Sequence, residues 1–93
     1  MQTGLLSTYM VTIVVSEFVN IEATLPADAT PVNLWSRKDV SNQSDFALEI
    51  MVDSITFSAE YFNLPSIFKK MDAAVIPDFQ FDGKEGYAMV TFR

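Results

Sequence analysis

Acidic side chains recur along one side of a segment that has helical spacing. Asp45, Glu49, Asp53 and Glu60 share a face, and none of them has a Lys or Arg four residues further on. Such a row could bind a cation or a basic partner. Carboxylates four residues apart on a free surface repel mildly rather than chelate, and surface helices commonly carry such charges. We therefore favour a solvated helix face over a cation site or a docking surface.

Two residue types that carry much of protein chemistry are missing. The 93 residues include no His and no Cys. A His/Cys zinc site, a disulfide, a thiol nucleophile and a Ser-His-Asp relay therefore cannot be built from this chain. We expect no cofactor to be held by these residues in those ways.

The charge balance is acidic, with 12 Asp and Glu against 6 Lys and Arg and a net charge of −6 at pH 7. Nucleic acids and anionic membranes require clustered basic residues, so we expect no nucleic-acid partner. The apolar run from Met10 to Val15 is shorter than the roughly 18 residues that a membrane helix needs, so we expect no membrane segment. No basic residue precedes Arg37, which argues against a secretory signal, and the absence of Cys leaves the redox compartment undecided.

The chain is rich in apolar residues for its size. Apolar residues make up 49% of it and charged residues only 19%, below the roughly 25% of ordinary soluble domains. Either the fold buries an unusual share of its surface, or an apolar face packs against something outside these residues.

Residue patterns predict the elements that would position these groups. Apolar residues spaced by three and four predict an amphipathic helix of about five turns that ends near Asn63, before Leu64-Pro65. Its predicted apolar face is Ala47, Leu48, Met51, Ile55, Ala59 and Phe62, and its start is capped within 41–45. Extended backbone is predicted for 7–23, 32–35, 71–76 and 87–92, and a loop, the best candidate for a subdomain boundary, for 25–31. The order of strands, helix and strands predicts an α+β fold.

The segment from Asp82 to Gly86 has the pattern of a hairpin turn. Asp-Gly between aromatic, alternating stretches favours such a turn, in which Gly83 would supply a positive φ. A functional carboxylate at Glu85 is the alternative, although one Glu is not a motif.

The triplet Asn42-Gln43-Ser44 matches the acceptor pattern for N-glycosylation. The same residues are also explained as a helix start, which we favour.

Five stretches share their residue pattern with one enzyme family. They are Leu6 to Val11 with Val15 to Phe18, Asn42 to Leu48, Glu60 to Pro65, Lys70 to Asp72, and Ala74 to Phe79. In this order they resemble segments of the gluzincin aminopeptidases, the zinc enzymes related to alanyl aminopeptidase and aminopeptidase N. The resemblance covers essentially the whole chain.

The resemblance implies a domain organisation. Residues 1–22 would be the end of an N-terminal β domain. Residues 23–93 would begin a thermolysin-like catalytic domain, with one long helix and a short mixed sheet but without the zinc site. The chain would then be a fragment that lacks other parts of the aminopeptidase fold, which would explain its surplus of apolar residues.

The resemblance also points to candidate site residues. The family's Gly-Ala-Met-Glu-Asn motif aligns with Asp82-Gly83-Lys84-Glu85-Gly86, so Glu85 falls on the carboxylate that holds the free amine of a peptide substrate, and Gly83 on a residue that offers backbone to it. The motif is degenerate here: Asp82, Lys84 and Gly86 replace Gly, Met and Asn. Zinc would belong to the parent enzyme, because the family's His-Glu-x-x-His helix lies downstream of this motif.

The residues and the resemblance leave three alternative functions for the chain. In the first, the chain is part of a zinc aminopeptidase that removes N-terminal residues from peptides, and it is inactive alone. In the second, it is a non-catalytic binding or interaction module that kept part of the aminopeptidase scaffold. The third, a small α+β domain with an accidental likeness, must explain several ordered matches at once and is the least favoured.

Overall fold

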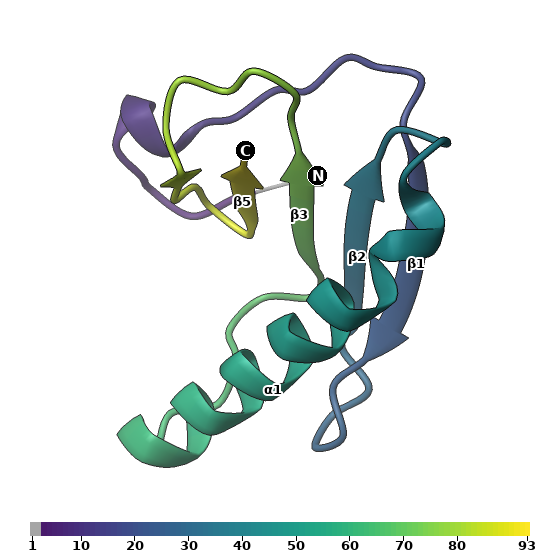
Figure 1. The fold of residues 1–93 in the computed structure, drawn as a ribbon. Coiled ribbons are helices and arrows are strands. Elements are labelled where there is room, and N and C mark those ends of the chain that lie inside the picture. Colours follow the sequence, from purple (N-terminus) through teal and green to yellow (C-terminus); the bar gives the residue numbers. More distant parts are fainter. Residues whose placement is uncertain (1–2) are drawn as a thin grey trace.

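The computed structural model describes residues 3–93, which form one mixed sheet and one long helix (Figure 1). The strands are β1 (Val19–Thr24), β2 (Pro31–Ser36), β3 (Met71–Val75), β4 (Gly83–Lys84) and β5 (Met89–Phe92), and the helix is α1 (Asp45–Phe62). Two short 3-10 turns, η1 (Thr8–Met10) and η2 (Ser41–Gln43), complete the set. The predicted α+β class is confirmed.

The sheet has five strands in the order β1-β2-β3-β5-β4. The outer pairs, β1 with β2 and β4 with β5, are antiparallel, whereas β2, β3 and β5 run parallel. Parallel neighbours need a long crossover connection, and α1 provides the one between β2 and β3. It lies across one face of the sheet, and its last turns extend beyond the strands (Figure 1).

The predicted helix is confirmed from Asp45 to Phe62, with part of its apolar face wrong. Leu48 is buried, and Met51 and Ile55 pack against the core, as predicted. Ala47 and Phe62 are exposed. Phe62 is the last residue of α1, whose final turns extend beyond the strands (Figure 1). The helix ends at Asn63, which adopts the left-handed conformation (φ 52°) that terminates many helices.

The start of α1 differs from the prediction of a side-chain cap. Ser44 occupies the cap position but makes no capping hydrogen bond with its side chain. Its hydroxyl donates instead to the carbonyl of Val40 at 3.3 Å and lies 3.4 Å from the hydroxyl of Ser36. Ser44 therefore ties the helix start to the end of β2.

The core lies between α1 and the centre of the sheet. Its buried members are Leu25, Val32, Leu34, Leu48 and Ala73. Val32 and Ala73 have no exposed surface. Because side chains alternate along strands, Asn33 and Trp35 of β2 and Asp72 and Ala74 of β3 point to the opposite face.

The loop predicted at 25–31 is confirmed as the connection between β1 and β2. The amide of Leu25 donates to the carbonyl of Thr30 at 2.9 Å, and the amide of Ala29 donates to the carbonyl of Leu25 at 2.9 Å. The loop joins two neighbours of one sheet, and β1 runs through residues 22 and 23. The division into 1–22 and 23–93 stays a prediction, and residues 1–2 of its first part lie outside the described residues.

The predicted extended segment 7–23 is correct only in its second half, where β1 forms. Residues 8–18, which we call the N-terminal strap, contain η1 and then an irregular extended stretch. Thr12 and Val14 are half-buried, whereas Val11, Ile13 and Val15 are exposed. In the described part of the chain the strap is not hydrogen-bonded into the sheet, so its β-branched residues lack the partner that a ladder requires.

The predicted turn at Asp82–Gly86 is misplaced. Gly83 pairs with Phe92, and Lys84 with Thr91, so both belong to β4 and the turn spans 85–88. None of the chain's glycines, all of them described, has a positive φ, and the left-handed residue of this turn is Ala88 (φ 56°). Gly86 is needed for a different reason: a Cβ there would lie 2.6 Å from the carbonyl oxygen of Met89.

No helix within residues 3–93 has both the length and the apolar character to cross a bilayer.

Gly86→Ala tests the close approach at the turn. A Cβ cannot share space with a carbonyl oxygen, so the turn must shift, and we expect a loss of about 1–3 kcal/mol in the free energy of unfolding. Gly83→Ala is the matched control, because its Cβ would meet the Phe92 ring at 3.4 Å and the Thr91 carbonyl oxygen at 3.8 Å, which are ordinary contacts. Urea unfolding of both variants checks this, and equal losses would contradict it.

Asp28 should make the β1–β2 hairpin sensitive to acid. Hydrogen bonds from the side chain and the backbone of Thr30 lower the pKa of its carboxyl, and the Thr30 amide lies 3.0 Å from Oδ1. A lowered folded pKa means that the stabilisation is complete above the ordinary Asp pKa of about 3.9 and is lost as the pH falls through the folded pKa.

We therefore expect the stability advantage of the wild type over Asp28→Asn to shrink as the pH falls below the ordinary Asp pKa of about 3.9. Urea midpoints measured from neutral to strongly acid pH check this. An advantage that stays constant with pH would contradict it.

Candidate functional site

Glu85 lies in the turn between β4 and β5, next to the N-terminal strap. Its carboxylate is exposed, and Oε1 accepts a hydrogen bond from the Tyr9 hydroxyl at 3.3 Å. Two residues on, the Tyr87 amide donates to the carbonyl of Met10 at 3.0 Å. Residues far apart in the sequence therefore meet at the predicted amine-binding carboxylate.

Gly86 lies where the turn packs against the strap. The space where its Cβ would lie is 3.0 Å from the Thr12 hydroxyl oxygen and 3.3 Å from the carbonyl oxygen of Met10. The strap atoms make this position tight, and the carbonyl oxygen of Met89 at 2.6 Å excludes a Cβ, so a Gly here lets the turn pack against the strap.

Gly83 lies apart from this contact, at the sheet's edge. It is exposed and belongs to β4, which pairs with β5 alone. An edge strand presents unpaired backbone groups to one side, which is the type of surface that an extended peptide can join. Gly83 and Glu85 are thus neighbours along one exposed segment.

The other charged residues of this segment, Asp82 and Lys84, make no ion pair with each other or with Glu85 within residues 3–93. Asp82 accepts a hydrogen bond from Arg93 at 2.6 Å, which closes the far end of the β4–β5 hairpin. The three ion pairs formed within residues 3–93 are Arg37–Asp39, Lys70–Asp72 and Arg93–Asp82. Lys84 is therefore not paired with Glu85, and the described hydrogen bond to the Glu85 carboxylate comes from Tyr9.

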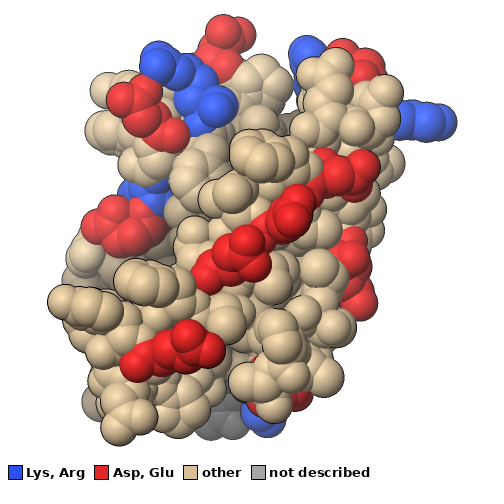
Figure 2. Space-filling view, turned by 60° about the horizontal axis from the view of Figure 1, so that its bottom comes forward, with Lys and Arg blue, Asp and Glu red and all other residues tan. Residues whose placement is uncertain are grey.

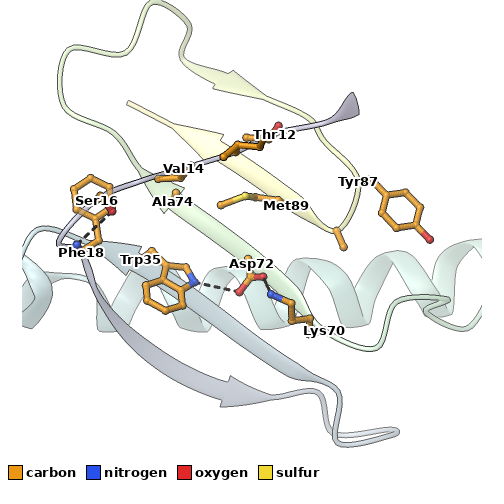
Figure 3. A pocket seen from close by; sticks show the side chains of 12 residues that line it. Thr12, Val14, Ser16, Phe18, Trp35, Lys70, Asp72, Ala74, Tyr87 and Met89 are labelled. Carbon is orange, nitrogen blue, oxygen red and sulfur yellow. Dashed lines mark hydrogen bonds and ion pairs between the residues drawn. The ribbon is translucent and has the colours of Figure 1, made fainter. Parts of the chain in front are cut away.

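A cleft of about 420 Å³ lies between the strap and the sheet, on the face opposite α1 (Figure 3). Thr12, Val14 and Phe18 line it from the strap side. Tyr87 and Met89 extend its wall toward the turn that carries Glu85, although Glu85 itself is not part of the lining.

Asp72 is the charged centre of this cleft. The residue is only 6% exposed, yet each carboxylate oxygen has a donor: the Trp35 indole N–H lies 3.1 Å from Oδ1, and Lys70 pairs with Oδ2. Figure 3 shows Trp35 and Lys70 reaching Asp72 from either side. A buried carboxylate satisfied in this way holds strands together and is not free to act as a base.

We call Asp72, Trp35 and Lys70 the buried triad. The sequence analysis did not single it out. The signal was present: Asp72 is a lone acid in an apolar strand, and a buried acid needs donors. Which donors reach it depends on strand register, because Asn33 is the direct partner of Asp72 and Trp35 lies two positions further along.

The acidic residues of α1 lie in a row on the solvent side, as Figure 2 shows. Asp45, Glu49, Asp53 and Glu60 are all exposed. Within residues 3–93, no three His, Cys, Asp or Glu side chains are grouped so as to hold a metal ion. The arrangement fits separate solvated carboxylates.

Comparison with known proteins places the whole chain beside one group of enzymes. It is 38% identical over 92 residues to Aminopeptidase M1-A of Oryza sativa subsp. japonica, 34% over 88 residues to Endoplasmic reticulum aminopeptidase 1 of Mus musculus, and 32% over 93 residues to Aminopeptidase N of Oryctolagus cuniculus. These alignments include 99%, 95% and 98% of this chain but only 10%, 9% and 10% of the relatives. The chain thus spans about a tenth of their length. No family model matches it.

Asp72→Asn tests the buried triad. An amide at this position can still accept from Trp35 but brings its own N–H donors against the Lys70 ammonium, so we expect a loss of about 1–3 kcal/mol in the free energy of unfolding. Asp53→Asn, on the exposed face of α1, is the matched control and should change stability by no more than about 0.5 kcal/mol. Denaturant unfolding measures both, and equal effects would show that the triad contributes nothing.

Proposed function

The chain belongs to the gluzincin aminopeptidase family and corresponds to one segment of its members. We propose that it supplies the amine-binding segment of a zinc aminopeptidase that removes N-terminal residues from peptides. The observation that carries the proposal is identity of 32–38% to aminopeptidases over nearly every residue of the chain. Residues 1–22 are then the end of a β domain and residues 23–93 the start of the catalytic domain.

Glu85 would recognise the free N-terminus of the peptide. An ammonium pairs with a carboxylate through charge-assisted hydrogen bonds, which are about twice as strong as neutral ones. Fixing the terminus at one point also fixes which peptide bond reaches the catalytic group. The exposed position of Glu85, in a turn at the end of an edge strand, supports this role.

Gly83 would guide the peptide backbone toward Glu85. Its place in β4, with one side of the strand unpaired, supports the role, because an extended peptide can hydrogen-bond to such an edge. The absence of a side chain keeps that approach open.

The residues of this chain do not fit a zinc ion. Catalytic zinc takes three protein ligands, usually His with a carboxylate, and the chain has no His or Cys. Its carboxylates within residues 3–93 are not grouped as ligands either. In the proposed enzyme, zinc is held by residues other than these 93, and this segment alone does not hydrolyse peptides.

One observation favours the second candidate, a non-catalytic binding module. In the amine-binding motif, Gly86 stands where the aminopeptidase family has Asn, and a Cβ at Gly86 would lie 2.6 Å from the carbonyl oxygen of Met89, so the turn does not accept a side chain at that point. A turn adapted to that contact could serve binding without catalysis.

A chimaera tests the proposal. We would replace the matching segment of Oryza sativa Aminopeptidase M1-A with this chain and measure hydrolysis of an aminoacyl p-nitroanilide. We expect turnover, and Glu85→Gln should lower kcat/KM by about 10- to 100-fold, because a hydrogen bond to a charged group contributes about 1.5–3 kcal/mol.

Glu49→Gln is the matched control, since Glu49 is an exposed carboxylate on α1, and it should leave kcat/KM within about twofold. A chimaera that melts cooperatively but does not hydrolyse would favour the binding module. Equal effects of the two substitutions would remove Glu85 from the proposed role. Turnover by the purified 93-residue chain, retained in chelator, would overturn its proposed inactivity.

A further inference from the structure

We infer that Tyr9 is a positioning residue for Glu85: its hydroxyl holds the carboxylate in the orientation that amine binding requires. The inference rests on the function proposed for Glu85. The observation behind it is the hydrogen bond from the Tyr9 hydroxyl to Glu85 Oε1 at 3.3 Å, between residues 76 positions apart.

Glu85 needs such support because, in the part of the chain that the structure describes, the bond from Tyr9 is the one hydrogen bond given for its side chain. It is exposed, lies in a turn, and has no ion pair within residues 3–93. A glutamate side chain loses up to about 2 kcal/mol of conformational entropy when it is ordered. A binding site that has already ordered this side chain avoids that cost when the ligand arrives.

Tyrosine suits the task chemically. Its hydroxyl is a neutral donor that uses one of the roughly four acceptor sites of a carboxylate. Oε2 and the remaining site on Oε1 stay available to an ammonium group. Tyr9 therefore orients Glu85 without competing for the substrate's charge.

The backbone keeps the two residues in register. Next to Tyr9, the carbonyl of Met10 accepts from the Tyr87 amide at 3.0 Å. On the strap side, η1 fixes the local turn through the Met10 amide, which donates to the carbonyl of Ser7 at 3.0 Å. With the close contact at Gly86, these bonds hold the backbone of Tyr9 beside the turn.

The test uses the full 93-residue chain and compares Tyr9→Phe with Tyr61→Phe. Tyr61 is an exposed tyrosine of α1 that packs against Phe57 and Phe62, and its hydroxyl makes no hydrogen bond described within residues 3–93. Both substitutions remove one hydroxyl and keep the ring. NMR couplings to the Glu85 methylene protons report its side-chain rotamer and need no ligand. Hydrogen exchange of the Tyr87 amide reports the fastening of the strap.

We expect one dominant Glu85 rotamer in the wild type and in Tyr61→Phe, and averaged couplings in Tyr9→Phe with Tyr87 amide exchange unchanged. A single rotamer retained in Tyr9→Phe would overturn the inference. Averaged couplings accompanied by faster Tyr87 exchange would also overturn it, because Tyr9 would then only fasten the strap.

Titration with leucinamide, and with N-acetyl-leucinamide as the control that lacks a free amine, separates this inference from the proposed function. We expect leucinamide alone to shift the amide signals of 85–87, Glu85→Gln to abolish the shifts, and Tyr9→Phe to weaken binding about fivefold, as for loss of one ordinary hydrogen bond. If Glu85→Gln binds leucinamide as the wild type does, or if leucinamide shifts nothing, the amine-binding function fails whatever the rotamer shows.

Discussion

The packing of α1 on the centre of the sheet is the contact on which the other features depend. Strands β2 and β3 are parallel neighbours, so the chain between them has to cross a face of the sheet, and Leu48 of α1 is buried there against Val32, Leu34 and Ala73. Ala73 offers a small side chain in the middle of the contact. Once β3 is placed in this way, β5 can pair with it, and the turn that carries Glu85 follows from that pairing.

The two faces of the sheet have different roles. One face is apolar and holds the helix. The other carries Asp72 with its two donors, and the N-terminal strap covers part of it. The strap reaches the turn at 85–88 from this second face, so the surroundings of Glu85 are built from the two ends of the described chain. Its position is a property of the tertiary structure and not of the motif alone.

Local patterns were enough to predict the regular elements near the core. The helix was predicted from its three- and four-residue spacing, the strand at 32–35 from its alternating pattern and the strand at 71–76 from its apolar run, and the structure has β2 and β3 at these places. The pattern failed where the burial of a side chain depends on the rest of the fold. Phe62 continues the apolar spacing of α1, yet it is exposed at the end of the helix. Val11, Ile13 and Val15 are typical strand residues, yet within residues 3–93 they lie in a segment that pairs with no strand of the sheet.

The candidate site was predictable only in part. Resemblance pointed to Glu85 and Gly83, but the turn was placed too early because Asp-Gly is a strong local signal and the register of β4 against β5 is not local information. The contact between Tyr9 and Glu85 and the triad around Asp72 could not be predicted. Each depends on which side chains the strand order brings together, and no spacing in the sequence encodes that order.

The indole bonded to Asp72 has an optical consequence. Trp35 is the only tryptophan of the chain, and it lines the cleft beneath the strap, far from the outer surface of α1. The wavelength of its emission therefore follows the wetting of that cleft. If the strap lifted, the emission maximum of Trp35 would shift to longer wavelength while the helical circular dichroism signal stayed constant. The molecule therefore carries its own reporter that distinguishes a local opening from complete unfolding.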